Sequence, residues 1–368
     1  MADTNNQVED SSEFGDIEVT GPFTEMTQNL GGAFWKLLGE NVPGSLHWSM
    51  LLITLALAIL LYWIRGGRGA KTAEGRERQS NTFSEYLFPA DIYRHVSARV
   101  DIWLWCLERV LRPFWVVSLL VVFAPRIETA VIRSLEWALG STPALDATYF
   151  WMLFYSLTIL LLYDLFFYVI HYTMHRFTFF WAIHKVHHSA EVLTPLTRYR
   201  EHFLAGPIWA SGGMLAYSIS GGIFAYLFDG SLVAATLFNL GFFSALFGLT
   251  GNFRHSHILL HYPVWLSLWL QSPAMHHSHH SYLPQHLGTN LAAVTSIWDR
   301  LFGTIYIPVK DEFTPWGLGD ETQKDYRSFQ QNVFGPFLDW WGIAAKRFNS
   351  EDSRWGRFLE LFNAVKRN

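Results

Sequence analysis

Residues 147–175 read ATYFWMLFYSLTILLLYDLFFYVIHYTMH, and this stretch decides the fold. Its apolar part, 147–170, carries Asp164 as its one charged residue. It is long enough for a helix to cross the hydrocarbon core of a bilayer, which takes about 20 residues. His171 and His175 follow without a break, one helical turn apart. The stretch therefore predicts a membrane-spanning helix that ends in a pair of histidines.

The composition agrees with a membrane protein. Of 368 residues, 50% are hydrophobic, 17% are aromatic and 16% are charged, whereas a soluble domain has about 25% charged residues. The net charge of −4 and the absence of a basic stripe exclude a nucleic-acid-binding protein. Cys106 is the one cysteine, which excludes an intrachain disulfide, a cysteine-ligated zinc and an iron–sulfur cluster. A metal in this chain must therefore be held by nitrogen or oxygen.

Further apolar runs predict more spans at 46–64, 203–228 and 231–249. The run 102–124 includes charged residues, which fits either a tilted span or an in-plane amphipathic helix. Five basic residues between 65 and 78 predict a cytoplasmic loop by the positive-inside rule. We predict an all-α integral membrane protein with four to five membrane-spanning helices and a cytoplasmic, histidine-rich helical cap.

A two-residue turn, Asp229-Gly230, joins the last two apolar runs and predicts a helical hairpin through the membrane. The hairpin leaves and returns to one face, so segments 171–202 and 251–286 share that face. Together they hold fourteen of the sixteen histidines.

Four regions follow from these patterns. We predict a flexible acidic tail at 1–40, membrane helices and a basic loop at 46–140, a catalytic membrane domain at 147–305 and an amphipathic cytoplasmic segment at 306–368. Residues 1–35 lack the features of a secretory signal. We therefore predict a bacterial inner membrane protein with its active site on the cytoplasmic face.

The histidines recur at helical spacing in HYTMH (171–175), HKVHH (184–188) and SPAMHHSHHS (272–281). Positions i, i+3 and i+4 lie on one helical face, so their imidazoles can reach a shared metal. The eight candidate ligands are His171, His175, His184, His187, His188, His276, His279 and His280. Because one zinc takes about four protein ligands, eight predict two metal ions.

Three other kinds of protein could carry histidine clusters: a zinc hydrolase, a metal transporter and an inactive relative of an enzyme. A zinc hydrolase with H-E-x-x-H is not favoured, because Glu201-His202 lacks the second histidine. A membrane metal transporter or metal-binding protein with histidine-rich loops remains the alternative. Transporters usually carry ionisable groups along the membrane interior, and the stretches 147–170 and 203–249 offer only Asp164, near one end, and Asp229 in the turn. A catalytically inactive relative has no physical reason to keep the complete ligand set.

These motifs resemble the fatty acid hydroxylase and sterol desaturase superfamily of integral-membrane di-iron enzymes. The histidine patterns match H-x(3)-H and two H-x-x-H-H boxes, and Asp164 and Tyr168 stand in the D-x(3)-Y-x(2)-H spacing before His171. IHKVHHS (183–189) and SIWDRLFGT (296–304) are similar to the family's core and closing motifs. RHSH (254–257) resembles its N-H-S-N element, which makes His255 a ninth candidate ligand.

The resemblance implies O2-dependent hydroxylation or desaturation of an unactivated C–H position of a lipid. It implies two iron ions (Fe²⁺) and O2 as co-substrate, with zinc as a possible substitute in purified protein. The partners are then the lipid substrate, the membrane and an external electron donor, a ferredoxin or a cytochrome b5-type protein. No dinucleotide-binding motif or cysteine set supplies the electrons within this chain.

Several residues near the candidate ligands are predicted to hydrogen-bond to the imidazoles and hold them in place. Asp164 is predicted to accept a hydrogen bond that fixes an imidazole tautomer. The other candidates for this outer layer are Tyr168, His202, His257 and Asn290. Asn290-Leu291-Ala292 replaces the family's N-Y-G, and His257 and His277 stand where Asn and Arg are common. His261 and His286 are taken as interface residues.

Overall fold

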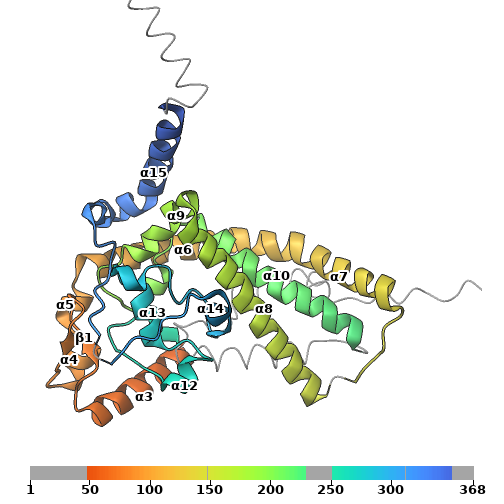
Figure 1. Ribbon diagram of the computed structural model, residues 1–368, viewed down its shortest axis with the longest axis horizontal. Coiled ribbons are helices and arrows are strands. Elements are labelled where there is room, and N and C mark those ends of the chain that lie inside the picture. Colours follow the sequence, from red (N-terminus) through yellow and green to blue (C-terminus); the bar gives the residue numbers. More distant parts are fainter. Residues whose placement is uncertain (1–47, 147, 229–250, 311, 350–368) are drawn as a thin grey trace, which may run out of the picture.

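The computed structural model describes residues 48–146, 148–228, 251–310 and 312–349 (Figure 1). This part of the chain is mostly helical. The longer helices are α3 (Trp48–Arg65), α6 (Val96–Ser118), α7 (Ala124–Leu139), α8 (Tyr149–Arg176), α9 (Thr178–His188), α10 (Ala205–Leu227) and α15 (Phe329–Asn349). The shorter ones are α4 (Phe83–Leu87), α5 (Ala90–Tyr93), α12 (Val264–Ser267), α13 (Pro273–His279) and α14 (Ile297–Phe302), with 3₁₀ segments at 197–199, 284–286 and 321–326.

Two helical stretches in the described residues are long and apolar enough to cross a membrane. One is α8, which runs from the predicted span into the first histidine pair as a single helix. The other is Val96–Leu139, in which α6 and α7 are joined by a π-helical turn at Leu119–Phe123. The run 102–124, for which two interpretations were open, is thus part of a continuous 44-residue helix.

Glycines let α10 approach its neighbours closely. A Cβ at Gly212 would lie 2.7 Å from the Ile170 side chain of α8, and one at Gly222 would lie 2.8 Å from the Glu128 carbonyl of α7. Small residues at helix interfaces allow this close packing in membrane proteins. Figure 1 shows α7, α8 and α10 lying alongside one another, and α10 packs against both of the others. Although the sequence predicts a span at 203–228, α10 is not among the two candidate spans.

The first predicted span corresponds to α3, whose apolar stretch, Met50–Arg65, is shorter than the two candidates. Beyond α3, the predicted basic loop contains a small antiparallel sheet of β1 (Ala70–Lys71) and β2 (Glu77–Arg78), which the all-α prediction missed. Glycines with positive φ at 66, 67, 69 and 75 permit its tight turns.

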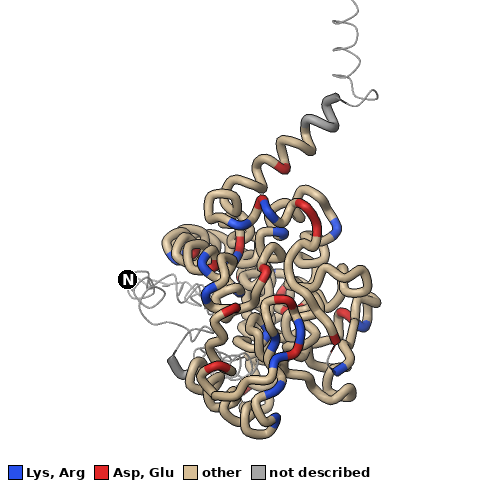
Figure 2. The backbone as a smooth tube through the Cα atoms, turned by 90° about the vertical axis from the view of Figure 1, so that its left-hand side faces the viewer, with Lys and Arg blue, Asp and Glu red and all other residues tan. Residues whose placement is uncertain are grey.

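Helices α9 and α13 carry the second and third histidine motifs. Helix α9 follows the end of α8 that bears His171, α14 packs against α8, and α15 projects away from them (Figure 1). Seen from the side of β1, α4 and α5, acidic and basic residues are interspersed along the described chain (Figure 2). The predicted tail at 1–40, the span at 231–249 and the end of the C-terminal segment lie outside the described residues.

Candidate metal centre

Nine histidines converge in two adjacent groups. The five-histidine cluster contains His171, His175, His184, His188 and His279, and the four-histidine cluster contains His187, His255, His276 and His280. Within each cluster, one ring nitrogen of every residue lies within 4.8 Å of the others. The structure therefore brings together all eight histidines of the three motifs, together with His255.

Sequence spacing explains how neighbours are divided between the clusters. Consecutive residues of a helix point about 100° apart, because a turn takes about 3.6 residues. His187 and His188 of α9 therefore face different clusters, as do His279 and His280 at the end of α13. Helix α13 begins at Pro273, with Ser272 as its N-cap accepting from the Met275 amide at 3.3 Å. This start fixes where the third motif points.

Nε2 atoms face one another at the distances expected around a metal. In the five-histidine cluster, His171 Nε2 lies 3.1 Å from His184 Nε2. In the four-histidine cluster, His255 Nε2 lies 3.2 Å from His187 Nε2 and 2.9 Å from His276 Nε2. Metal–imidazole bonds of about 2.0–2.1 Å place neighbouring nitrogens about 3 Å apart. The donor set therefore fits a metal ion in each cluster.

Three further nitrogens support the same conclusion. The Nε2 atoms of His175, His188 and His279 are buried and have no hydrogen-bond partner. Buried polar atoms without partners are rare and usually point to a ligand, an ion or a water. These three belong to the five-histidine cluster, where a metal would satisfy them.

Backbone carbonyls fix the outer nitrogen of several rings. His171 Nδ1 donates to the Leu291 carbonyl at 2.7 Å, and His279 Nδ1 donates to the Thr289 carbonyl at 2.8 Å. Because a carbonyl can only accept, Nδ1 carries the proton and Nε2 keeps its lone pair for a metal. One loop thus sets the tautomer of ligands from α8 and α13.

Two buried aspartates hold this loop. Asp299 accepts from the amides of Leu291 and Ala292, at 2.8 and 3.0 Å. Asp164 accepts from the amides of 293, 294 and 295 and from the Thr295 hydroxyl. The Asp164 prediction is therefore wrong in its detail, because both of its oxygens serve the loop and none of its bonds goes to an imidazole. Asp164 supports His171 only indirectly, because it holds the loop whose Leu291 carbonyl accepts from His171 Nδ1.

Asn290 sits at the bend of the loop with a φ of +55°. Its side chain donates to the carbonyls of Met275 and Tyr306 and accepts from the Tyr306 amide. It therefore shapes the backbone between the two acceptor carbonyls, consistent with its predicted place near the ligands. Tyr168 hydrogen-bonds to Thr304 at 3.1 Å, which makes it a further part of this framework.

The other predicted outer residues lie elsewhere. His202 donates to the Val333 carbonyl of α15 at 3.0 Å, and His257 donates to the Tyr86 carbonyl at 2.8 Å. His277 donates to the Phe253 carbonyl, so it faces away from both clusters. His286 was taken as an interface residue, but it is fully buried and lies 2.9 Å from the Glu312 carboxylate. Each of these bonds ties distant segments together.

The clusters are electrically neutral at ordinary pH. Burial, reinforced by the neighbouring imidazoles, lowers the pKa of His184, His188, His255, His276 and His280 well below the usual range. Burial likewise lowers the pKa of His187 to about 3 and that of His279 to about 4. Neutral imidazole is the form that binds metals, so these rings are ready to act as ligands.

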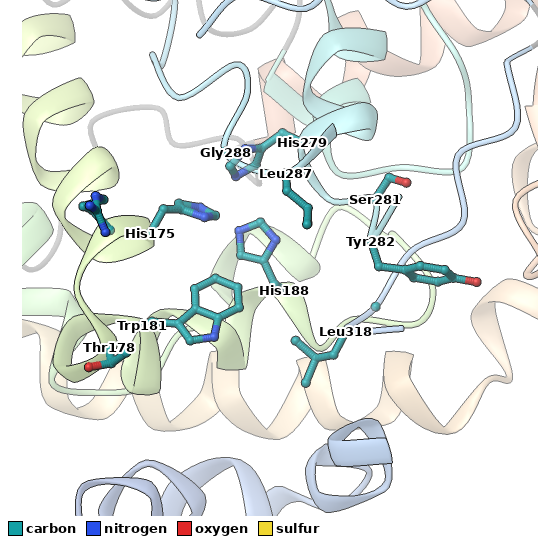
Figure 3. A pocket seen from close by; sticks show the side chains of 12 residues that line it. His175, Thr178, Trp181, His188, His279, Ser281, Tyr282, Leu287, Gly288 and Leu318 are labelled. Carbon is teal, nitrogen blue, oxygen red and sulfur yellow. The ribbon is translucent and has the colours of Figure 1, made fainter. Parts of the chain in front are cut away.

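A cavity of about 380 Å³ reaches the five-histidine cluster (Figure 3). His175, His188 and His279 form part of its wall. The other lining residues are Arg176, Thr178, Trp181, Ser281, Tyr282, Leu287, Gly288, Gly317 and Leu318. No residue of the four-histidine cluster lines it. Molecules from outside can therefore approach one cluster by this route.

Two functional elements escaped the sequence analysis. The carbonyls of Thr289 and Leu291 carry no side-chain signal, so only the fold could place them. Arg200 is fully buried and donates to the Asp101 carboxylate at 2.9 Å, to the Val186 carbonyl and to the Tyr326 carbonyl. It joins α6, α9 and the C-terminal segment behind His187. Nothing in the sequence around Arg200 distinguishes a buried arginine from an exposed one.

The comparisons with known proteins agree with this geometry. The family model described as "Fatty acid hydroxylase" matches residues 156–304, a range that contains all nine clustered histidines. No solved structure matches the chain. The match implies an oxidoreductase, and with two apolar helices long enough to span a bilayer it indicates a membrane protein. Over residues 156–304, the family model thus confirms the resemblance to the fatty acid hydroxylase/sterol desaturase superfamily that the histidine motifs indicate.

Proposed function

We propose that this protein is a membrane-bound, O2-dependent di-iron oxidoreductase that hydroxylates or desaturates a lipid. The observation that carries the proposal is the pair of adjacent all-histidine clusters, one of which lines a cavity. The family match supports lipid oxidation as the reaction class. Hydroxylation is the favoured outcome, and desaturation is the second.

The five-histidine cluster would hold one iron and the four-histidine cluster the other. Bound there, the pair would supply the oxidation of an unactivated C–H bond by O2. For hydroxylation, R–H, O2, two electrons and two protons give R–OH and water. For desaturation, the same inputs remove two hydrogens from the lipid and give an alkene and two waters. Both balances require two electrons from outside the chain.

The residues of the chain position the substrate and keep water out. Trp181 and Leu318 give the cavity apolar walls, and Leu287 lies at its edge (Figure 3). Trp181 packs against His175 and His188, with ring centroids 5.2 and 5.4 Å apart. An alkyl segment entering here would meet the three unpaired Nε2 atoms or the metal that they bind. Holding the C–H bond at a fixed place lowers the barrier by reducing the entropy lost at reaction.

The proposal includes a location and an electron donor. We place the protein in a bacterial inner membrane as a multi-pass protein, with the clusters on the cytoplasmic side. A ferredoxin or a cytochrome b5-type protein would dock there. Zinc would occupy the same imidazoles in protein purified without added iron.

A membrane metal transporter is not favoured. In the described residues, Asp164 is the acid inside α8, and both of its oxygens accept bonds from the 293–295 loop. A transport path needs ionisable groups free to bind a cation within the membrane. The family match also points away from transport.

The test uses full-length protein in lipid nanodiscs, isolated from iron-supplemented cells. We expect two irons per chain, and O2 consumption that depends on dithionite-reduced ferredoxin and on added membrane lipid extract. Mass spectrometry of the lipids should show a gain of one oxygen or a loss of two hydrogens. Two irons with no lipid product from any extract would overturn the proposed reaction. Fewer than two metals per chain would overturn the di-iron site itself.

A further inference from the structure

Glu201 brings a carboxylate against the four-histidine cluster. Its Oε1 atom lies 3.5 Å from His187 Nδ1, and its other oxygen, Oε2, is buried without a hydrogen-bond partner. In the described part of the chain, no other carboxylate lies within 4.0 Å of a clustered imidazole nitrogen. The residue stands between Arg200 and His202, at the chain's approach to α10. A single acid thus meets an otherwise neutral set of nine ligands.

The side of the ring that Glu201 meets defines what it can do. His187 Nε2 points at His255 Nε2, 3.2 Å away, and so faces the cluster. Nδ1 is on the outer side of the ring, where the Arg200 carbonyl also lies, at 3.3 Å. Glu201 therefore cannot replace His187 as a ligand without a large movement. It lies against Nδ1 beside the Arg200 carbonyl, which accepts from Nδ1–H, and can help to orient the ring from there.

His187 is the one member of its cluster that receives such support. The Nδ1 atoms of His255, His276 and His280 are buried and have no partner in the described structure. In the five-histidine cluster, the comparable acceptors are neutral carbonyls. Among the ligands of the four-histidine cluster, outer support is therefore concentrated on His187, where the Arg200 carbonyl and Glu201 both meet Nδ1.

Trp209 extends the contact toward the other cluster. Burial raises the pKa of Glu201 to about 8, and the contact with the Trp209 side chain opposes this shift. The Trp209 ring also lies beside His171 and His184, with centroids 5.5 and 5.8 Å away, and stacks on Phe167. The indole thus lies between Glu201 and two ligands of the five-histidine cluster.

We infer that Glu201 is a positioning residue that, together with the Arg200 carbonyl, orients His187, and that it is the one carboxylate in the described part of the chain that lies next to the two-metal site. The inference rests on the proposed function for the presence of the metals. A carboxylate behind a ligating histidine raises the basicity of the ring and fixes its direction. Two divalent ions on nine neutral imidazoles carry four positive charges, so a carboxylate beside them lowers the energy of the loaded state.

The experiment compares Glu201→Gln with Glu191→Gln in iron-loaded full-length protein. Glutamine keeps the size and an acceptor oxygen but removes the charge. Glu191 is a matched control, because its carboxylate pairs with Arg327 on the surface and touches neither cluster. Release of iron to the chelator ferrozine is followed in time, with Mössbauer spectra of ⁵⁷Fe-loaded samples.

We expect Glu201→Gln to release one of its two irons about 10–100 times faster than the wild type does, as for other losses of such outer partners. One of the two Mössbauer doublets should shift, and Glu191→Gln should match the wild type. Glu201→Asp, which restores the charge, should recover most of the slow release. Wild-type release and spectra in Glu201→Gln would overturn the inference.

Two other outcomes also decide it. If both Glu201→Gln and Glu201→Asp lose both irons together with a lower Tm, Glu201 is a structural residue and the inference fails. If the wild type binds fewer than two irons, the proposed function fails first. If the wild type holds two irons and Glu201→Gln behaves like it, the metal site stands and only this role is lost.

Discussion

His171 Nδ1 lies 2.7 Å from the carbonyl oxygen of Leu291, a residue 120 positions later in the chain. This bond joins a candidate membrane-spanning helix to the loop that follows the third histidine motif. The same loop orients His279, and Asp299 holds its amides from behind. The geometry of the five-histidine cluster therefore depends on residues that lie outside it.

Asp299→Asn should loosen the five-histidine cluster without touching a ligand. Each oxygen of Asp299 accepts two hydrogen bonds, and the amide group of asparagine would oppose two of the donors. We expect a loss of about 1–3 kcal/mol in stability and partial loss of one metal. Thermal unfolding and metal analysis of the same samples measure both. Unchanged metal content together with a lower Tm would show that the loop stabilises the fold but does not affect metal binding by the five-histidine cluster.

Substitution of adjacent histidines should empty different sites. His279→Ala removes a ligand from the five-histidine cluster, and His280→Ala removes one from the four-histidine cluster. We expect each variant to retain about one metal firmly and to bind the second about 10-fold or more weaker. His277→Ala is the control on the same helix, since His277 bonds to the Phe253 carbonyl. Metal titration of the three variants is the measurement, and equal losses in all three would contradict the two-cluster assignment.

Arg200→Met should be strongly destabilising. The guanidinium is fully buried and pairs with Asp101, which is also fully buried. Removing one partner leaves an uncompensated buried charge, at a cost of about 3–5 kcal/mol. Arg327→Met breaks the ion pair with Glu191, in which the arginine is exposed, and should cost less than about 1 kcal/mol. Denaturation of both variants in detergent gives the comparison, and a similar small effect for both would be against this role.

Lys71 should make stability depend on pH above neutrality. Burial lowers its pKa from 10.5 to about 8 in the folded protein. Between pH 8 and 10.5 the unfolded chain holds the proton and the folded chain does not, so the free energy of unfolding rises with pH. Lys71→Met should remove this rise, which is at most about 1.4 kcal/mol per pH unit. The difference in Tm between wild type and variant at pH 7.5 and pH 10 tests it, and a constant difference would be the contrary result.

The exposed apolar side chains of α8 should face lipid. Leu157 and Leu161 are partly exposed in the isolated chain, although α8 is one of the two candidate spans. Because Cys106 is the one cysteine, nitroxides can be placed singly in a Cys106→Ser background. Labels at 157 and 161 should be accessible to O2 and shielded from a nickel chelate. A label at the exposed Thr322 should behave in the opposite way, and nickel access at 157 would exclude a lipid-facing helix.

Patterns of side chains predicted the site better than they predicted its surroundings. The spacing i, i+3, i+4 identifies histidines on one helical face, and the structure brings those of all three motifs together. The same reasoning could not divide them into clusters of five and four, because that depends on how α8, α9 and α13 pack. The sequence predicts a hydrogen bond from an imidazole to Asp164. In the structure, backbone carbonyls of the 289–295 loop accept from the imidazoles instead, and no side-chain pattern reveals them.

The fold was predicted unevenly for physical reasons. A long apolar run such as 147–170 specifies a helix by itself, and α8 follows it. The glycines of α10 serve close packing against α7 and α8, which an apolar pattern alone does not reveal, and α10 is not among the two candidate spans. The sheet at β1 and β2 depends on glycines in the left-handed region, a signal that was present at 66, 67 and 69 but was assigned to a loop.

Neighbouring residues serve different clusters twice, at 187–188 and at 279–280. In each pair, one peptide bond links a ligand of the first cluster to a ligand of the second. The separation between the two sites is therefore set by covalent geometry at two independent places. Movements of whole helices can change the shape of each site, but they leave the spacing between the sites nearly constant. The distance between the two sites should therefore change little when the membrane or the helices around the sites move.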